Sequence, residues 1–143
     1  MDSLFSRSRT TVDETLDQIK KILAGSTDWT VGEPVFNDLS NVFDYLASIP
    51  SPSCILLYNG TSYGDETISS HSFSVVIVDA DYGDNAKARI KAQGFADKAI
   101  GLLDFQMLNN TKTLITCVSQ SILQFSNSTP HVGVKIDFKA EED

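Results

Sequence analysis

The stretch Ala86 to Leu108, AKARIKAQGFADKAIGLLDFQML, decides the fold class, because it carries the longest helical pattern in the chain. Its apolar side chains recur three and four residues apart and form one stripe: Ala88, Ala92, Phe95, Ala96, Ala99, Ile100, Leu103 and Met107. This spacing predicts an amphipathic helix. Small alanines at the contact allow close approach, so we expect the helix to lie flat across a sheet. Asp84 and Asn85 precede it as N-cap candidates, and Asn109-Asn110 ends it.

The segments on either side of this helix carry strand patterns. Residues 71–78 are apolar on both faces, which predicts a central strand, and 54–58 form a short apolar run that indicates a buried one. Between them, 60–70 is expected to be a hairpin loop or a longer excursion. After the helix, 113–124 is long enough for one bent strand or two. Residues 132–138 alternate with a period of two, which predicts a strand with one face on the core.

Two further helices are expected before the first strand. Thr11 and Glu14 match a capping box, and apolar residues at helical spacing follow, so the first helix is predicted over 12–24. Pro34 can open a second helix, predicted over 35–47, where Phe36, Leu39, Phe43 and Leu46 fall three to four residues apart.

This order of elements predicts an α+β fold. We expect a mostly antiparallel, or mixed, sheet with one long helix packed across it and two N-terminal helices. The 143 residues suit a single domain, 1–143, with a flexible N-terminal arm over 1–10 and an acidic tail over 140–143.

Composition and charge exclude several classes of protein. Hydrophobic residues make up 41% and charged residues 21% of the chain, which is ordinary globular usage. The net charge of −8 argues against a general binder of nucleic acid or anionic membrane, since both need a positive surface. The negative charge is compatible with a ring that has an acidic lumen through which DNA slides. No membrane span or signal peptide is visible, so we expect an intracellular protein that is not secreted.

The two cysteines, Cys54 and Cys117, each lie in an apolar run. They are interpreted as buried free thiols, because cysteine is often buried. A disulfide stays open, since it requires adjacent strands with compatible geometry.

No motif carries recognisable chemistry. The turn 79–84 begins like a calcium loop, but its sixth and twelfth positions are Asp84 and Ile90 instead of glycine and glutamate. We interpret it as a helix cap. His71 and His131 lack a metal-ligand spacing, and no nucleophile elbow or phosphate loop is present. The sequence therefore predicts no catalytic residue, no cofactor and no metal ligand.

Four residues are candidates for partner contact. Trp29 and Tyr63 are aromatic residues in predicted loops, where exposed rings often mark interfaces. Arg7 and Arg9 form the basic pair of the N-terminal arm and suit an acidic neighbour.

The order of elements resembles one known family. Two short N-terminal helices, a proline-flanked strand (PSPSCILLY, 50–58), a loop, a second strand (HSFSVVIV, 71–78), an amphipathic helix and C-terminal strands span residues 12–139. This architecture is similar to that of the tail terminator and tail-completion (neck) proteins of long-tailed bacteriophages. The resemblance implies a non-catalytic protein of the virion that forms a ring, commonly a hexamer. Such a ring would cap the tail tube, join it to the head connector and let DNA pass through its lumen.

Two other classes remain open. One is a small adaptor domain that binds a protein through a sheet edge. The other is an enzyme whose site is assembled only at a subunit interface, around His71, His131 and Asp81.

Overall fold

In the computed structural model, the described residues are 11–32, 35–36, 52–63, 69–80, 85–109, 112–124 and 131–142. They form two helices, α2 (Val12–Ala24) and α4 (Asn85–Leu103). The strands are β1 (Thr30–Val31), β2 (Val35–Phe36), β3 (Ser53–Tyr63), β4 (Ser69–Ala80), β5 (Met107–Leu108), β6 (Thr113–Gln124) and β7 (His131–Glu142).

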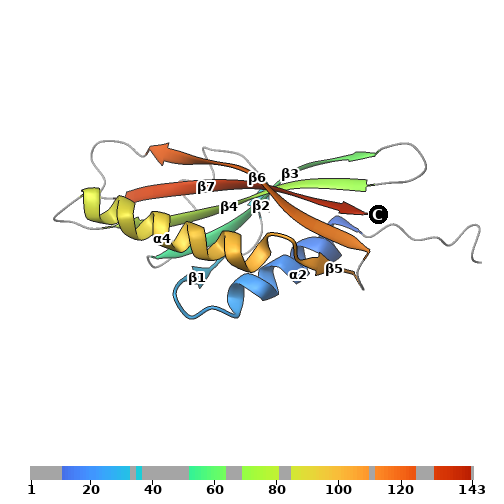
Figure 1. Ribbon diagram of the computed structural model, residues 1–143, viewed down its shortest axis with the longest axis horizontal. Coiled ribbons are helices and arrows are strands. Elements are labelled where there is room, and N and C mark those ends of the chain that lie inside the picture. The colour runs from blue at the N-terminus through green and yellow to red at the C-terminus, as the bar shows by residue number, and fades with distance from the viewer. Residues whose placement is uncertain are drawn as a thin grey trace, which may run out of the picture.

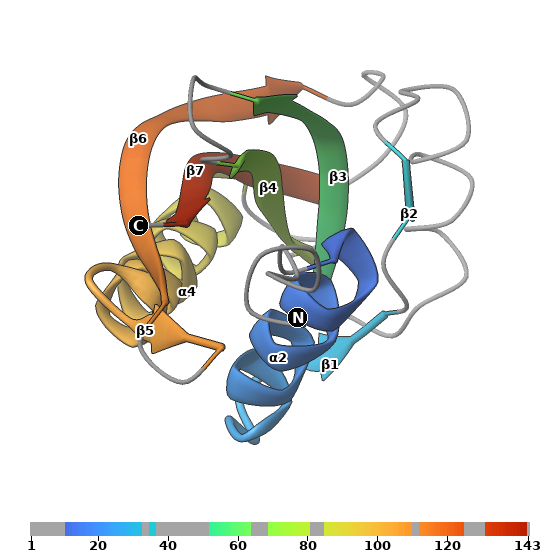
Figure 2. The same cartoon turned by 90° about the vertical axis from the view of Figure 1, so that its right-hand side faces the viewer.

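All seven strands belong to one mixed sheet (Figure 1). Its order is β1-β3-β4-β7-β6-β5, and β2 also pairs with β3. The four long strands pair antiparallel, whereas β1 and β2 both run parallel to β3. The sheet curves strongly into an open half-barrel, and the two helices lie on its concave side (Figure 2).

The central position of β4 explains its composition. It pairs with β3 from Ser53↔Val78 to Tyr63↔Ser69, and with β7 from Ser70↔Glu141 to Ala80↔His131. Residues 75–78 are all at most 1% exposed, so both faces of the strand are covered. The prediction of a central strand over 71–78 is confirmed.

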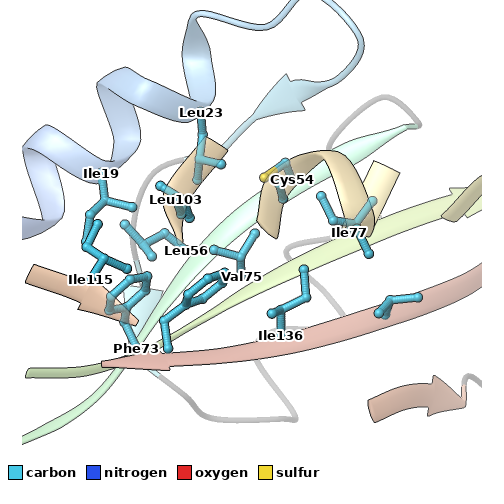
Figure 3. Packing of buried hydrophobic residues seen from close by; sticks show 14 of the residues in the cluster. Ile19, Leu23, Cys54, Leu56, Phe73, Val75, Ile77, Leu103, Ile115 and Ile136 are labelled. Carbon is cyan, nitrogen blue, oxygen red and sulfur yellow. The ribbon is translucent and has the colours of Figure 1, made fainter. Parts of the chain in front are cut away.

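Alanines let α4 pack closely against β4 and β7. Ala88, Ala92, Ala96 and Ala99 are all fully buried, and Leu103 ends the same stripe. Beside α4, Ile19 and Leu23 of α2 reach the core made by Leu56, Phe73, Val75 and Ile136 of the sheet (Figure 3). The rings of Phe73 and Phe138 stack at 5.2 Å between centroids across β4 and β7.

Helix α2 begins and docks through polar contacts. Thr11 is the N-cap, and its hydroxyl accepts a hydrogen bond from the Glu14 amide at 3.1 Å, so the predicted helix over 12–24 is confirmed. Asn109, with a φ of +54°, joins α2 to the turn before β6. Its backbone amide donates to Gln18 Oε1 at 2.9 Å, and its Nδ2 donates to Thr113 Oγ1 at 3.0 Å and Thr15 Oγ1 at 3.4 Å. Gln18 Nε2 donates back to Asn109 Oδ1.

The predicted fold class, with two N-terminal helices, is wrong. Val35 and Phe36, the start of the helix predicted over 35–47, form strand β2, in register with Leu57 and Tyr58 of β3. Strand pairing outweighs the local helical spacing here, as tertiary context often does. The rest of that predicted helix lies outside the described residues, as do the arm over 1–10 and most of the loop after Tyr63.

Two predicted boundaries also move. Helix α4 ends at Leu103 instead of Leu108, because Met107 and Leu108 pair with Leu114 and Thr113 of β6. Strand β3 continues past Tyr58 through a bulge at which Gly60 adopts a φ of +135°, a conformation that glycine tolerates.

Candidate functional site

The outer edge of β6 is hydrogen-bonded to described residues only along the first half of the strand. Along the first half of β6, strand β5 and the turn before it form backbone hydrogen bonds with this edge. Phe105 N donates to Ile115 O at 2.8 Å, and Ile115 N donates to Gln106 O at 2.9 Å. The amide of Cys117 donates to Asp104 Oδ1 at 2.9 Å. Beyond Cys117, no strand among the described residues pairs with this edge. The segment Val118–Gln124, here called the β6 edge, is therefore open, which here means that no described strand pairs with it.

A bulge and two large apolar side chains mark the β6 edge. The register between β6 and β7 shifts between Cys117 and Ser119, which leaves Val118 as the extra residue, and its side chain is 60% exposed. Ile122 is 57% exposed. It lies opposite the buried Val134, so it points to the concave side of the sheet. These apolar side chains are exposed at the margin of the core.

Helix α4 reaches the start of the β6 edge and does not cover it. Gln93 Nε2 of α4 donates to Gln120 Oε1 at 3.0 Å. Helix α4 packs mainly against β7 and β4 and only slightly against β6. Ile122 lies two residues further along β6, so its exposure follows from the position of the helix.

Apart from the bulge at Val118, the β6 edge lacks the features that protect exposed strand edges. Strand β6, TLITCVSQSILQ, holds no charged residue, no proline and no glycine, although 21% of the whole chain is charged. Natural edge strands usually carry lysine, proline or inward-pointing charge, which prevents pairing with other chains. Apart from its bulge, this edge is a template for strand addition.

A second open edge lies on the opposite side of the sheet. Strand β3 pairs with β1 and β2 only as far as Tyr58. No described strand pairs with the outer side of Asn59–Tyr63, here called the β3 edge. Tyr63, at its end, is 62% exposed, which agrees with the exposed ring expected there. This part of β3 also carries no charged residue.

Trp29 does not have the exposed ring that was expected of it. It is 6% exposed, and its Nε1 donates to Leu23 O at 2.9 Å. Its ring meets Phe95 edge to face at 6.1 Å, and Lys98 Nζ lies 5.9 Å from the ring centroid. Trp29 therefore ties α2 to α4 as a core residue. Arg7 and Arg9 lie outside the described residues.

Polar side chains cross the convex face in one continuous chain of hydrogen bonds. Asn59 Nδ2 donates to Ser74 Oγ at 2.7 Å, and Ser74 Oγ donates to Asp137 Oδ1 at 2.6 Å. Ser119 Oγ donates to Asp137 Oδ2 at 3.1 Å, and Lys135 Nζ lies 3.9 Å from Asp137 Oδ1. Ser74 is fully buried, and its hydroxyl donates a hydrogen bond to the carboxylate of Asp137. The arrangement ties four strands together.

The two histidines lie at opposite ends of the sheet. His71 is level with Ala140, and His131 is level with Ala80, along the same β4–β7 pair. Nine residues of strand separate these levels, or about 30 Å. One chain therefore does not bring His71 and His131 together, and Asp81 lies outside the described residues. His71 is 2% exposed, and its Nδ1 lies 2.8 Å from Thr61 Oγ1.

Both cysteines are free thiols. Strands β4 and β7 lie between their strands, so the open question of a disulfide is settled against one within the chain. Burial raises the pKa of Cys54 to about 12. Cys117 is only partly buried, which corrects its interpretation as a buried thiol. Partial burial and the carboxylates of Asp104 and Asp137 raise its pKa above the ordinary range. Neither thiol has the lowered pKa of a reactive cysteine.

No family model matches the chain, and no curated protein matches it. Within the described residues, no three histidine, cysteine or acidic side chains gather as a metal site. Neither described helix is long and apolar enough to cross a membrane.

The β6 edge was not predicted from the sequence, although one signal of it is present there. Residues 113–124 contain no charged side chain, although the chain as a whole is acidic. The three consecutive polar residues Ser119, Gln120 and Ser121 argue against burial of both faces of this segment.

Proposed function

We propose that the chain is a non-catalytic assembly protein that forms a closed ring, as the tail terminator proteins of long-tailed bacteriophages do. The observation that carries the proposal is a pair of uncharged edges, on opposite sides of one half-barrel, with which no described strand pairs. A subunit with two different adhesive surfaces forms head-to-tail contacts, and these close into a ring when the rotation between copies permits.

The remaining parts of the proposal follow the resemblance in architecture. The ring caps the tail tube of a virion, docks on the head connector and assembles in the host cytoplasm. The net charge of −8 suits a conduit through which DNA moves without binding. A role in assembly requires surfaces that recognise other copies, and the β6 edge supplies such a surface.

Light scattering after size-exclusion chromatography tests the ring. We expect one species of several copies, with a central hole in negative-stain electron micrographs. A protein that is strictly monomeric at concentrations up to 1 mM would contradict the proposal. A gene position between head-connector and tail-tube genes would support the more specific role.

A protein-binding adaptor is the second candidate, because the same β6 edge can accept an extended peptide as an added strand. A monomer that binds uncharged, β-prone peptides, and loses this binding when Ile122 is replaced by lysine, would favour the adaptor over the ring.

A further inference from the structure

The two open edges have strand directions that fit each other. Strands β3, β4, β7 and β6 are neighbours in this order, and each neighbouring pair is antiparallel. Strand β6 therefore runs opposite to β3. The two edges lie at opposite ends of the strands: Thr61 is level with His71, whereas Ile122 is level with Val134 and Ile77, six residues further along β4. If a second copy continues the sheet in the same orientation and is shifted along the strands by these six residues, or about 20 Å, its β3 edge lies beside the first copy's β6 edge and runs antiparallel to it. Neighbouring long strands would then remain antiparallel across the boundary between the two copies.

The exposed apolar side chains of the two edges lie on the same face of such a continued sheet. Tyr63 pairs with Ser69, which shares its face of β4 with His71 and the core residue Phe73. Tyr63 therefore points to the concave side, and Ile122 does so as well, because it lies opposite Val134. With exposures of 62% and 57%, the two side chains have most of their surface left to bury against each other.

The charge pattern also favours pairing between copies along these edges. Two copies that each carry a net charge of −8 repel each other over most approaches. The β6 edge and the β3 edge contain no charged side chain, so their pairing places no carboxylate opposite another. Like charges directly opposite each other on neighbouring strands destabilise a sheet.

We propose that the β6 edge of one copy pairs antiparallel with the β3 edge of the next copy, Gln120–Gln124 against Asn59–Tyr63, so that Ile122 lies opposite Thr61 and packs diagonally against Tyr63. This inference rests on the proposed ring and names the contact that builds it. The two edges differ, so the contact is head-to-tail, and each copy uses one edge on each side. The half-barrels then join into one continuous sheet.

Cross-linking distinguishes this contact from other contacts. The starting protein is Cys117→Ser, in which Cys54 stays because it is fully buried. Tyr63→Cys and Ile122→Cys are purified separately, mixed, and treated with a short bis-maleimide. We expect covalent dimers in the mixture and none from either variant alone. The variant with both substitutions is expected to give a ladder of covalent oligomers.

Two outcomes of this experiment overturn the proposal. Dimers from Ile122→Cys alone mean that β6 pairs with β6 in a two-fold contact. An absence of cross-links in the mixture, while the untreated protein is oligomeric by light scattering, means that the interface lies elsewhere. The second outcome leaves the proposed ring intact, so the two failures are distinguishable. Filaments that cross-link through Tyr63 and Ile122 would retain this contact and refute the closed ring.

A matched pair of surface variants gives an independent test. Ile122→Lys places a charge on the β6 edge, and Ile90→Lys makes the same change on α4, where the side chain is 60% exposed. Both side chains already face solvent, so both variants are expected to keep the circular dichroism of the parent. We expect the concentration for half-assembly to rise at least tenfold in Ile122→Lys and to stay unchanged in Ile90→Lys. Equal effects of the two substitutions would overturn the assignment of the β6 edge.

Discussion

Replacement of Asn109 by alanine is expected to loosen the attachment of α2 to the sheet. The substitution removes three side-chain hydrogen bonds, to Gln18, Thr15 and Thr113. The hydroxyls of the fully buried Thr15 and Thr113 lose this partner. Two good bonds at about 1 kcal/mol each, and a long one at about half that, give roughly 2.5 kcal/mol. The φ of +54° adds about 1 kcal/mol to this loss of stability, because alanine disfavours a positive φ.

The expected loss in free energy of unfolding is therefore about 3–4 kcal/mol, a large share of the roughly 5–15 kcal/mol of an ordinary domain. Urea denaturation followed by circular dichroism at one fixed protein concentration measures it. Asn109→Gly is the control, because glycine accepts the positive φ while losing the same bonds. We expect it to cost about 1 kcal/mol less than alanine. A loss below about 1 kcal/mol for Asn109→Ala, or a greater loss for glycine than for alanine, would contradict this role of Asn109.

The remaining predictions concern strain, ionisation and packing. Phe105→Gly should stabilise the protein by about 1 kcal/mol in the same urea assay, because Phe105 has a φ of +64° and is 71% exposed; a loss would mean that the ring contributes to folding. The pKa of Cys54 is higher in the folded protein than in the unfolded chain. The stability that this difference contributes is therefore fully present below about pH 8.5 and is lost as the pH rises toward 12. From pH 9 to 10.5, the wild type should lose about 2 kcal/mol more than Cys54→Ala, and parallel pH curves would contradict this. Asp104→Asn should lower the pKa of Cys117 and speed its alkylation by iodoacetamide at pH 8, an effect refuted by an unchanged pH profile. Ala96→Leu should cost about 1–3 kcal/mol by overpacking against the sheet, and a neutral result would mean that α4 can move away from it.

Local signals in the sequence identify the elements whose stability is itself local. The capping box at Thr11 and Glu14 appears as a hydrogen bond at the N-terminus of α2, and the alanine stripe appears as the buried face of α4. Both depend on residues three to four apart, which a sequence displays directly. For this reason the two described helices could be predicted.

The remaining features depend on partners far away in the sequence. Val35 and Phe36 fit a helix or a strand, and pairing with β3 decides between them. Trp29 lies in a loop by sequence, yet Phe95 and Lys98 of α4 enclose its ring. Which strand lies at the edge of a sheet is also a non-local property, so the open edge of β6 could not be deduced from its composition alone.

The pairing of β4 with β7 has a consequence for the protein during its synthesis. The ladder joins Ala80 to His131, about 50 residues later, and β7 is the last strand in chain order. At about 5–20 residues per second, the ribosome adds those residues in roughly 3–10 s. Throughout that interval the apolar β4 can pair with β3 on one side, while the strand that pairs with its other side, β7, has not yet been synthesised. Nascent chains on neighbouring ribosomes are then able to mispair, so slower translation after α4 is expected to lower the yield of native protein.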